Sequence, residues 1–483
     1  MPKNKVLKAG LGYTIGNYML KGSSFISIPI YTRLLSTSNY GNFNNFLTYG
    51  SIFCVIVGCA IHSSFKSARY RYKLNTEGAK VGKDYYSYTS TSVLFILLST
   101  TIWLLLANLF VNNLSNWLKM DKLSINLLII YSAASALIIC FNADVSIDYE
   151  YKRFLFVSGF NAIGTIIMSI VLLLTIFSRK RYFGMVFGTT IPSVLASVYV
   201  IYYFFKRARP DNFAWFLKWG IRYSLPIVPH GLSQIILNQF DRIMITSMVS
   251  AAATGIYSFA YNIYSILAVT FSSLDNVWSS WFYEQMYAKK YKDIRKISSI
   301  YMLLMFGFAT SVMFVSPELI KILGQKSYWG AKYSAIPIVA GGYFSFLYTI
   351  PASVEYFHSK TGWIAIGTTT AAIINIILNY LLIPKFGYIV AAYNTLITYI
   401  LYFVFHFFMA QKIQGKNLFS SYVILSCSLG IIVSSVVARL FIGIAWLRWI
   451  IAISIMILIT LYEEKYFGFI MKNFGFIMKK IKK

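Results

Sequence analysis

Residues 236–245 read ILNQFDRIMI and place a carboxylate, Asp241, beside a guanidinium, Arg242, inside a long apolar run. The run extends on both sides, over residues 222–249, and this length is enough to cross the hydrocarbon layer of a bilayer, about 30 Å thick, as a helix. Ionisable side chains at such a depth are costly and have to face a partner or a wet cavity. The stretch therefore predicts a transmembrane helix with one functional or paired polar face.

The whole chain has the same character. Its 483 residues are 58% hydrophobic and only 12% charged, with a mean hydropathy of +0.63, whereas soluble domains are about 25% charged. Backbone groups in lipid must be satisfied within each segment, so the spans are expected to be helices. We predict an all-α polytopic membrane protein of about fourteen spans, at residues 9–33, 40–63, 86–111, 124–145, 155–177, 183–205, 222–249, 253–278, 298–323, 334–357, 363–383, 387–409, 419–443 and 446–462.

The formal net charge of +29 reflects topology rather than nucleic-acid binding, because Lys and Arg lie mainly between the apolar segments. With the N-terminus inside, the positive-inside rule is satisfied, and only the SRKRYF loop at 178–183 is a basic loop placed outside. We expect a multi-pass protein of a bacterial cytoplasmic membrane with both termini cytoplasmic. The clusters on the inner side are KNKVLK, KSARYRYK, YKRF, KRARP, AKKYKDIRK, QKIQGK and the C-terminal tail.

Several kinds of chemistry have no pattern in the sequence. Cys54, Cys59, Cys140 and Cys427 lie in apolar segments without metal-ligand spacing, and the histidines at 62, 358 and 406 are scattered, so no metal site is predicted. No nucleotide-binding loop or nucleophile motif occurs, so we expect no enzyme and no cofactor. The predicted outer loops are short, which argues against a membrane glycosyltransferase or polymerase.

An internal repeat relates two stretches by a constant offset. LLSTSNYGNFNNFLTYGSIF, starting at Leu34, aligns with MVSAAATGIYSFAYNIYSIL, starting at Met248, and pairs Ser36 with Ser250 and Gly41 with Gly255. Both stretches join an outward-going span to an inward-going one, as in transporters built from parallel repeats. We predict an N-terminal lobe at 1–205, a cytoplasmic linker at 206–220, a C-terminal lobe at 221–410, two further helices at 411–462 and a basic amphipathic tail at 463–483.

Polar residues follow one face of the seventh and the first spans. At 100° per residue each set falls within an arc of about 80°. Pro226 and Pro229 predict a kink or a broken turn at the start of the seventh span. The two sets are His230, Gln234, Asn238 and Asp241, with Arg242 just beside them, and Thr14, Asn17, Lys21 and Ser24.

The equivalent positions of the two stripes suggest that both helices line one central cleft. Lys21 and Arg242 would then contact an anionic ligand, with Asn17, His230, Gln234 and Asn238 as the other substrate-binding residues. Two structural alternatives stay open. For Asp241 and Arg242, the alternative to ligand binding is an interhelical ion pair. For Lys21, the alternative is that the side chain extends its amine to the membrane surface.

The eighth span carries aromatic residues near one face, namely Tyr257, Tyr261 and Tyr264, on which sugar rings could stack; packing is the alternative. Asp275 lies on the same face. Glu355 and Asp241 are the carboxylates that we expect to couple transport to H⁺ or Na⁺, and Asp275 is a further candidate. Asp144, Glu318 and Glu355 lie near span ends, where solvated carboxylates are common.

Five stretches, spread over nearly the whole chain, together resemble the O-antigen and capsule repeat-unit flippases. These flippases are the polysaccharide-transport branch of the multidrug/oligosaccharidyl-lipid/polysaccharide exporter superfamily. The stretches are IPIYTRLLSTSNYGNFN at 28–44, YEYKRF at 149–154, residues 226–245 ending in NQFDRIMI, ATGIYSFAYN at 253–262 and LIPKFGYIVAAYNTL at 382–396.

The resemblance implies two six-helix lobes around a central cationic cavity, alternating access, and a substrate of undecaprenyl pyrophosphate carrying one oligosaccharide repeat unit. It places the family's basic position of the first helix on Lys21 and the Asp-Arg pair of the seventh on Asp241 and Arg242. Membrane lipids and a polysaccharide polymerase complex are the expected partners, and no nucleic acid is. A cation-coupled multidrug exporter of the same superfamily is the alternative, although only Lys21, Arg242 and Arg439 are predicted to lie deep in spans.

Overall fold

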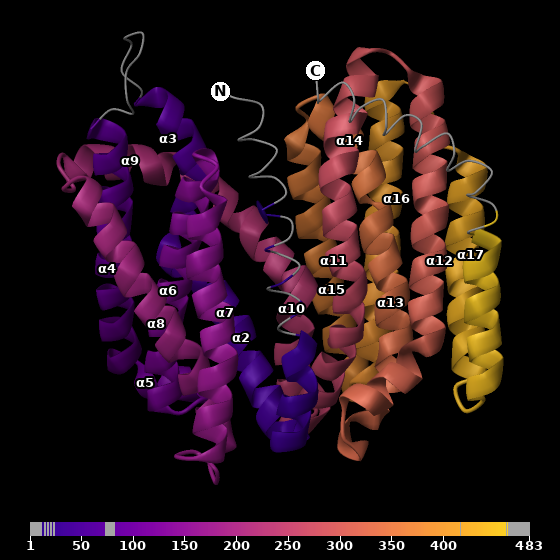
Figure 1. The fold of residues 1–483 in the computed structure, drawn as a ribbon, viewed down its shortest axis with the longest axis horizontal. Coiled ribbons are helices and arrows are strands. Elements are labelled where there is room, and N and C mark those ends of the chain that lie inside the picture. The colour runs from indigo at the N-terminus through magenta and orange to yellow at the C-terminus, as the bar shows by residue number, and fades with distance from the viewer. Residues whose placement is uncertain are drawn as a thin grey trace. The chain divides into compact units, whose positions relative to one another are not determined.

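The computed structural model describes residues 25–72, 83–415 and 417–459, together with residues 12, 13, 16, 19, 22 and 461. Nearly all of these residues are helical, and no strand occurs among them (Figure 1). The predicted all-α class is confirmed.

Nine helices in the described part of the chain are long and apolar enough to cross a membrane, or ten if the bent pair Thr37–Gly58 and Ile61–Arg71 is one span. The protein is therefore a multi-pass membrane protein. The helices at the predicted seventh and eighth spans are not among the nine, since polar residues interrupt their apolar runs. The count of fourteen stays a prediction, and the predicted C-terminal tail lies outside the described residues.

The chain divides into two compact units, Met1–Gly255 and Ile256–Lys483. In the first unit α6 is the central helix and packs against α2, α4, α7 and α8. Its buried face carries Leu128, Leu137 and Phe141. The helices of this unit are α2 (Thr37–Gly58), η1 (Ile61–Ser64), α3 (Phe65–Arg71), α4 (Lys83–Leu109), α5 (Val111–Leu118), α6 (Lys122–Ile147), α7 (Tyr151–Leu174), α8 (Arg181–Arg207), α9 (Phe213–Ser224), η2 (Leu225–Ile227) and α10 (Val228–Met248).

Two breaks shape the first unit. Cys59 and Ala60 adopt left-handed backbone angles, with φ of 45° and 49°, and the chain bends by 54° between α2 and the η1–α3 segment. The second break confirms the kink predicted at Pro226 and Pro229. The 3₁₀ turn η2 contains Pro226, and Pro229 occupies the first turn of α10, where its missing N–H has no helical partner to lose.

Most of the segment predicted as a linker is part of the packed first unit. Residues 213–224 form α9, which packs against η1 and α4. Aromatic rings contribute to this packing, because Tyr88 of α4 meets the rings of Phe216 and Trp219 at centroid distances of 6.0 and 5.3 Å. Tyr72, just after α3, adds contacts with the rings of Trp215, Phe216 and Trp219 at 5.8, 5.3 and 5.5 Å.

The second unit contains a layer of long, roughly parallel helices (Figure 1). Within it α13 packs against α12 and α16, and α16 packs against α14 and α15. α11 (Ala251–Tyr287) starts in the first unit and continues into the second. The other helices are α12 (Tyr291–Leu323), η3 (Lys326–Ala331), α13 (Lys332–Leu347), α14 (Thr349–Phe357), α15 (Thr361–Phe386), α16 (Ile389–Gln414), α17 (Ser421–Leu440) and a last apolar helix, Ala445–Ile459.

Candidate functional site

The predicted polar face of the seventh span lies on α10. Asn238 Nδ2 donates to the carbonyl of Gln234, 2.7 Å away, so these two residues are linked along the helix. His230 lies one turn nearer the start of α10; its Nδ1 is buried and has no hydrogen-bond partner among the described residues. The stripe is therefore a continuous polar strip over about three turns of helix.

Asp241 is the most enclosed member of this strip, with 1% of its surface exposed. Its Oδ1 accepts a hydrogen bond from the backbone N–H of Arg242, 3.0 Å away. The carbonyl of Arg242 in turn accepts a hydrogen bond from Thr254 Oγ1 at 3.2 Å. Both backbone polar groups of Arg242 are thus hydrogen-bonded to side chains, the N–H to Asp241 and the carbonyl to Thr254. This holds whether its guanidinium binds a ligand or forms an ion pair.

A polar network fixes α10 to its neighbours in the first unit. Asn45 Nδ2 of α2 donates to Thr246 Oγ1 at 2.5 Å, and Thr246 shares a hydrogen bond of 2.6 Å with Thr254. Hydrogen bonds between polar side chains are a common way of joining helices within lipid. The network therefore anchors the end of α10 that carries Asp241 and Arg242.

Lys21 and Asn17 lie outside the described residues. Their predicted role beside Arg242 stays a prediction. Arg439, the third residue predicted to lie deep, is exposed in the last turn of α17, and its guanidinium stacks over the Tyr333 ring at 4.5 Å.

The predicted aromatic stripe lies on α11. Tyr257 is fully buried, and its ring contacts that of Tyr261 at 5.4 Å; Tyr261 contacts Tyr264 at 6.1 Å. Tyr264 lies directly over Gly342 of α13, where a Cβ atom would collide with its ring. All three rings take part in packing, and sugar stacking on them stays a prediction. Asp275 is half-buried farther along the same helix.

Glu355 is buried and has a partner that the sequence did not suggest. Its Oε1 lies 2.6 Å from Nδ1 of His406, and both side chains are fully buried. The two residues come from α14 and α16 and are 51 positions apart in sequence. Glu355 is therefore not a solvated carboxylate at a span end, because neighbouring helices enclose it; its predicted role in ion coupling or an ion pair stays a prediction.

The same holds for Asp144 and Glu318. Asp144 is 1% exposed, and its oxygens accept hydrogen bonds from Tyr85 at 2.7 Å, Tyr203 at 3.0 Å and Arg207 at 2.6 Å. Glu318 forms a two-pronged ion pair with the buried Arg448, at 2.9 and 2.5 Å. These carboxylates are structural anchors and not solvated ends.

A chain of buried amides joins α15 to α16. Asn379 Nδ2 donates to Asn375 Oδ1 at 3.0 Å, and Asn394 Nδ2 donates to Asn379 Oδ1 at 2.9 Å. This network was not predicted, although the i, i+4 spacing of Asn375 and Asn379 in an apolar span is a signal for one shared polar face. Among the described residues no group of three or more His, Cys, Asp or Glu could hold a metal ion.

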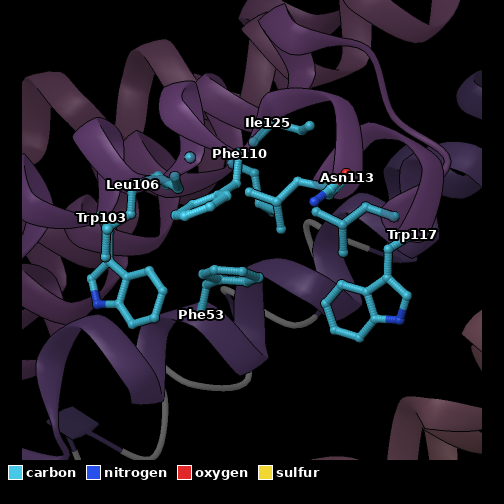
Figure 2. Close-up of a pocket in the computed structure, with 12 residues that line it drawn as sticks. Phe53, Trp103, Leu106, Phe110, Asn113, Trp117 and Ile125 are labelled. Atoms are coloured by element: carbon cyan, nitrogen blue, oxygen red, sulfur yellow. The ribbon is translucent and has the colours of Figure 1, made fainter.

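A separate pocket lies in the first unit, with a volume of about 440 Å³. Figure 2 shows the Phe53, Phe110 and Trp117 rings gathered around it, and Asn113 is the one lining residue with a polar amide. An interior of this kind suits a hydrocarbon chain and not a phosphate or a sugar. It is therefore unrelated to the charged strip of α10.

Comparison with known proteins identifies the family. A family model described as "Polysaccharide biosynthesis protein" matches residues 6–285, which is more than half of the chain. The chain belongs to this family. A relative from Haemophilus influenzae, "Lsg locus putative protein 1", is 21% identical over 374 residues, covering 74% of this chain and 86% of its own length.

Solved structures share the fold. A lipid II flippase MurJ in an inward closed conformation matches with a TM-score of 0.67 and 15% identity, over 94% of this chain and 99% of its own. An inward-facing multidrug resistance MATE family transporter of the MOP superfamily matches with a TM-score of 0.58 and 14% identity, over 82% of this chain and 96% of its own. The fold is shared with both of these proteins, and the predicted family resemblance is confirmed.

Proposed function

We propose that the protein translocates an undecaprenyl-pyrophosphate-linked oligosaccharide repeat unit from the cytoplasmic to the outer face of a bacterial cytoplasmic membrane, by alternating access. The observation that carries this proposal is the match of the polysaccharide biosynthesis family model to residues 6–285, together with the fold shared with a lipid II flippase over nearly both chains. The product would be built into a surface polysaccharide such as O-antigen, capsule or exopolysaccharide. A polymerase complex would receive it.

The charged residues give the proposal its chemistry. A pyrophosphate needs cationic groups shielded from water, and Arg242, on the polar strip of α10, and Lys21 are the residues assigned to it. Gln234 and Asn238 would contact the sugars. An H⁺ or Na⁺ gradient would supply the energy through a carboxylate, Asp241 or Glu355.

The experiment measures on which side of the membrane the lipid-linked repeat unit resides. Spheroplasts with and without the protein are treated with a membrane-impermeant sugar-oxidising probe. We expect loss of the protein to leave the repeat unit on the inner face, protected from the probe. Unchanged labelling, in cells with no second flippase, would refute the proposal.

Two variants test the assigned residues. K21A and R242A are expected to reduce surface polysaccharide at normal protein levels, because each removes a cation that the pyrophosphate needs. K289A, on an exposed basic loop, is the matched control. Full polysaccharide in both variants would remove these residues from the mechanism.

A multidrug exporter is the second candidate, because MATE transporters share the fold. The cations assigned to the substrate, Arg242 and Lys21, argue against it, since a site for cationic drugs favours acidic and aromatic groups. Drug efflux that depends on the protein, with unchanged polysaccharide, would reverse the order of the two candidates.

A further inference from the structure

Glu355 and His406 form an isolated acid–base pair inside the second unit. Glu355 lies in the last turn of α14 and His406 in the second half of α16, with Oε1 and Nδ1 2.6 Å apart and neither side chain exposed. A contact of this length requires a hydrogen between the two atoms. The pair can hold that hydrogen on either side.

Its net charge depends on one proton. A carboxylate with an imidazolium and a carboxylic acid with a neutral imidazole both have zero net charge, and they differ only in where one proton lies along the contact. Removal of this proton leaves a single negative charge in a fully enclosed site. Burying an uncompensated charge is strongly unfavourable. The packed structure therefore favours the state that holds the proton.

Two atoms of the pair are left unsatisfied. Glu355 Oε2 and His406 Nε2 are buried and have no hydrogen-bond partner in the described part of the chain. His406 Nε2 lies against Gly367 of α15, and a Cβ atom added to that glycine would be only 2.8 Å from Nε2. A pair serving only to hold helices together would gain from satisfying these atoms, and buried polar groups left unpaired in native proteins often have a functional role.

The groups around the pair are aromatic or acidic. The Tyr402 and Tyr348 rings lie 4.6 and 5.6 Å from the His406 ring, and Tyr402 is hydrogen-bonded to Thr368 of α15 at 3.0 Å. Asp275 of α11 is close enough to interact electrostatically with Tyr348 and Tyr356. Glu355 interacts with Tyr356 in the same way. Beyond the end of α14, Lys360 and His358 are exposed. Among the described residues, His406 is thus the basic side chain in hydrogen-bond contact with Glu355.

The ligand that fits is a proton and not a metal ion. The hard cations Ca²⁺ and Mg²⁺ take about six or more oxygen ligands. Here one carboxylate and one imidazole face each other, and no third metal-ligating side chain joins them among the described residues. A proton needs only the acid and the base.

The pair lies close to the basic end of the second unit. His358, next to the end of α14, shares a hydrogen bond of 2.8 Å between its Nε2 and Gln414 Oε1 at the end of α16. At the same end, Arg295 donates to the carbonyl of Asn417 at 2.6 Å. The loops at this end carry the basic clusters 288–296 and 411–416, which the positive-inside rule assigns to the cytoplasm.

We propose that Glu355 and His406 form a proton-binding site that holds one proton while α14, α15 and α16 are packed as in this structure, and releases it to cytoplasmic water when these helices separate. The existence of the site does not depend on the substrate. Its use as the coupling site of transport rests on the proposed function.

Proton binding is measured on the full-length protein in lipid nanodiscs, with histidine labelled by ¹⁵N in the ring. The chain has four histidines, and H406Q identifies the signals of His406. Over the pH range in which the protein stays folded, we expect both ring nitrogens of His406 to respond to pH together, in one step. E355Q should weaken proton binding to His406 about tenfold or more, because the compensating charge is gone.

The exposed Glu284 of α11 provides the matched control, E284Q, which should leave the step unchanged. E355Q has the size of the natural residue, which guards against misfolding, and H406N is a second variant if H406Q does not fold. Signals of His406 that do not change over this pH range, or that change identically in the natural protein and E355Q, would overturn the proposal.

A transport assay separates this proposal from the proposed function. In vesicles with an imposed pH gradient, E355Q and H406Q should lose the gradient-dependent part of lipid-linked substrate movement, and E284Q should keep it. If the natural protein moves no such substrate, the proposed function fails while the NMR titration still decides on the proton site. If it moves substrate and E355Q responds fully to the gradient, the coupling role fails alone.

Discussion

Gly41 and Gly255 make reciprocal close contacts where the first turns of α2 and α11 meet in the first unit. A Cβ atom on Gly41 would overlap the carbonyl oxygen of Ala251, and one on Gly255 would overlap that of Thr37. Ser36 and Ser250 precede the two helices, and each accepts a hydrogen bond from the N–H three residues on, at 3.2 and 3.1 Å. The paired residues of the predicted repeat thus have the same local structure.

The first prediction is that G41A and G255A each destabilise the protein by about 1–3 kcal/mol, as expected for overpacking. The added methyl group would meet backbone oxygen, which no side-chain rotation can move away. Thermal unfolding in detergent measures the effect. G362A is the control, since a Cβ there meets nothing within 4 Å. Equal midpoints for G41A and G362A would contradict the close approach.

The second prediction concerns Arg448, which joins the last apolar helix to α12. Besides Glu318, its guanidinium donates to the carbonyl of Phe314 at 2.7 Å. R448A should lower stability by about 3 kcal/mol, because removing one partner of a buried pair leaves the other uncompensated. R439A, which loses only a stacking contact at the surface, should cost about 1 kcal/mol or less.

The double variant R448M/E318L is the further test of that pair. Replacing both charges removes the desolvation cost together with the attraction. It should therefore be more stable than R448A in the same unfolding assay. A double variant no better than R448A would mean that the loss comes from packing and not from charge.

The sequence predicted helix positions well where apolar runs match the bilayer. The spans predicted at 86–111 and 183–205 correspond to α4 (Lys83–Leu109) and α8 (Arg181–Arg207). Their ends agree to within a few residues because hydrophobic length and flanking polar residues both determine where a span stops. The short helix α5 was not predicted, since a helix of this length leaves too weak a pattern in a loop.

Partners of buried charges could not be predicted in the same way. Arg207 and Asp144 are 63 positions apart, and Arg448 and Glu318 are 130 apart. Nothing in the spacing of such residues shows which helices will pack together. Arg448 nonetheless gave a signal, because a lone Arg inside an apolar segment has to find a partner. His406, inside the apolar stretch FVFHFF, gave the same kind of signal.

The third prediction is that D144N destabilises the first unit by about 3 kcal/mol. An asparagine can accept through only one oxygen, so Arg207 loses its countercharge and the hydroxyls of Tyr85 and Tyr203 compete for what remains. Y203F removes one hydrogen bond and should cost about 1 kcal/mol. Thermal unfolding followed by size-exclusion chromatography compares these variants, with the exposed Asp211 as the D211N control. Equal losses in D144N and D211N would contradict an anchoring role for Asp144.

The last prediction concerns orientation. The stretch 178–183 is basic, yet the proposed topology puts it outside. Local contacts account for one of its charges, since Arg181 donates to the carbonyl of Leu34 and, at 3.1 Å, to that of Ser178. Ser178 and Lys289 are both exposed and lie in loops predicted on opposite sides. In intact cells an impermeant maleimide should label S178C at once and K289C only after permeabilisation.

The unmodified chain controls for its own thiols, of which Cys140 and Cys427 are buried, while Cys54, within α2, and Cys59, at its end, are half-buried. Labelling of K289C but not S178C in intact cells would mean that the chain is inserted the other way round. The basic end of the second unit would then face outward, and the Glu355–His406 site would release its proton to the outer medium. The orientation therefore decides the direction in which that site can couple proton movement to transport.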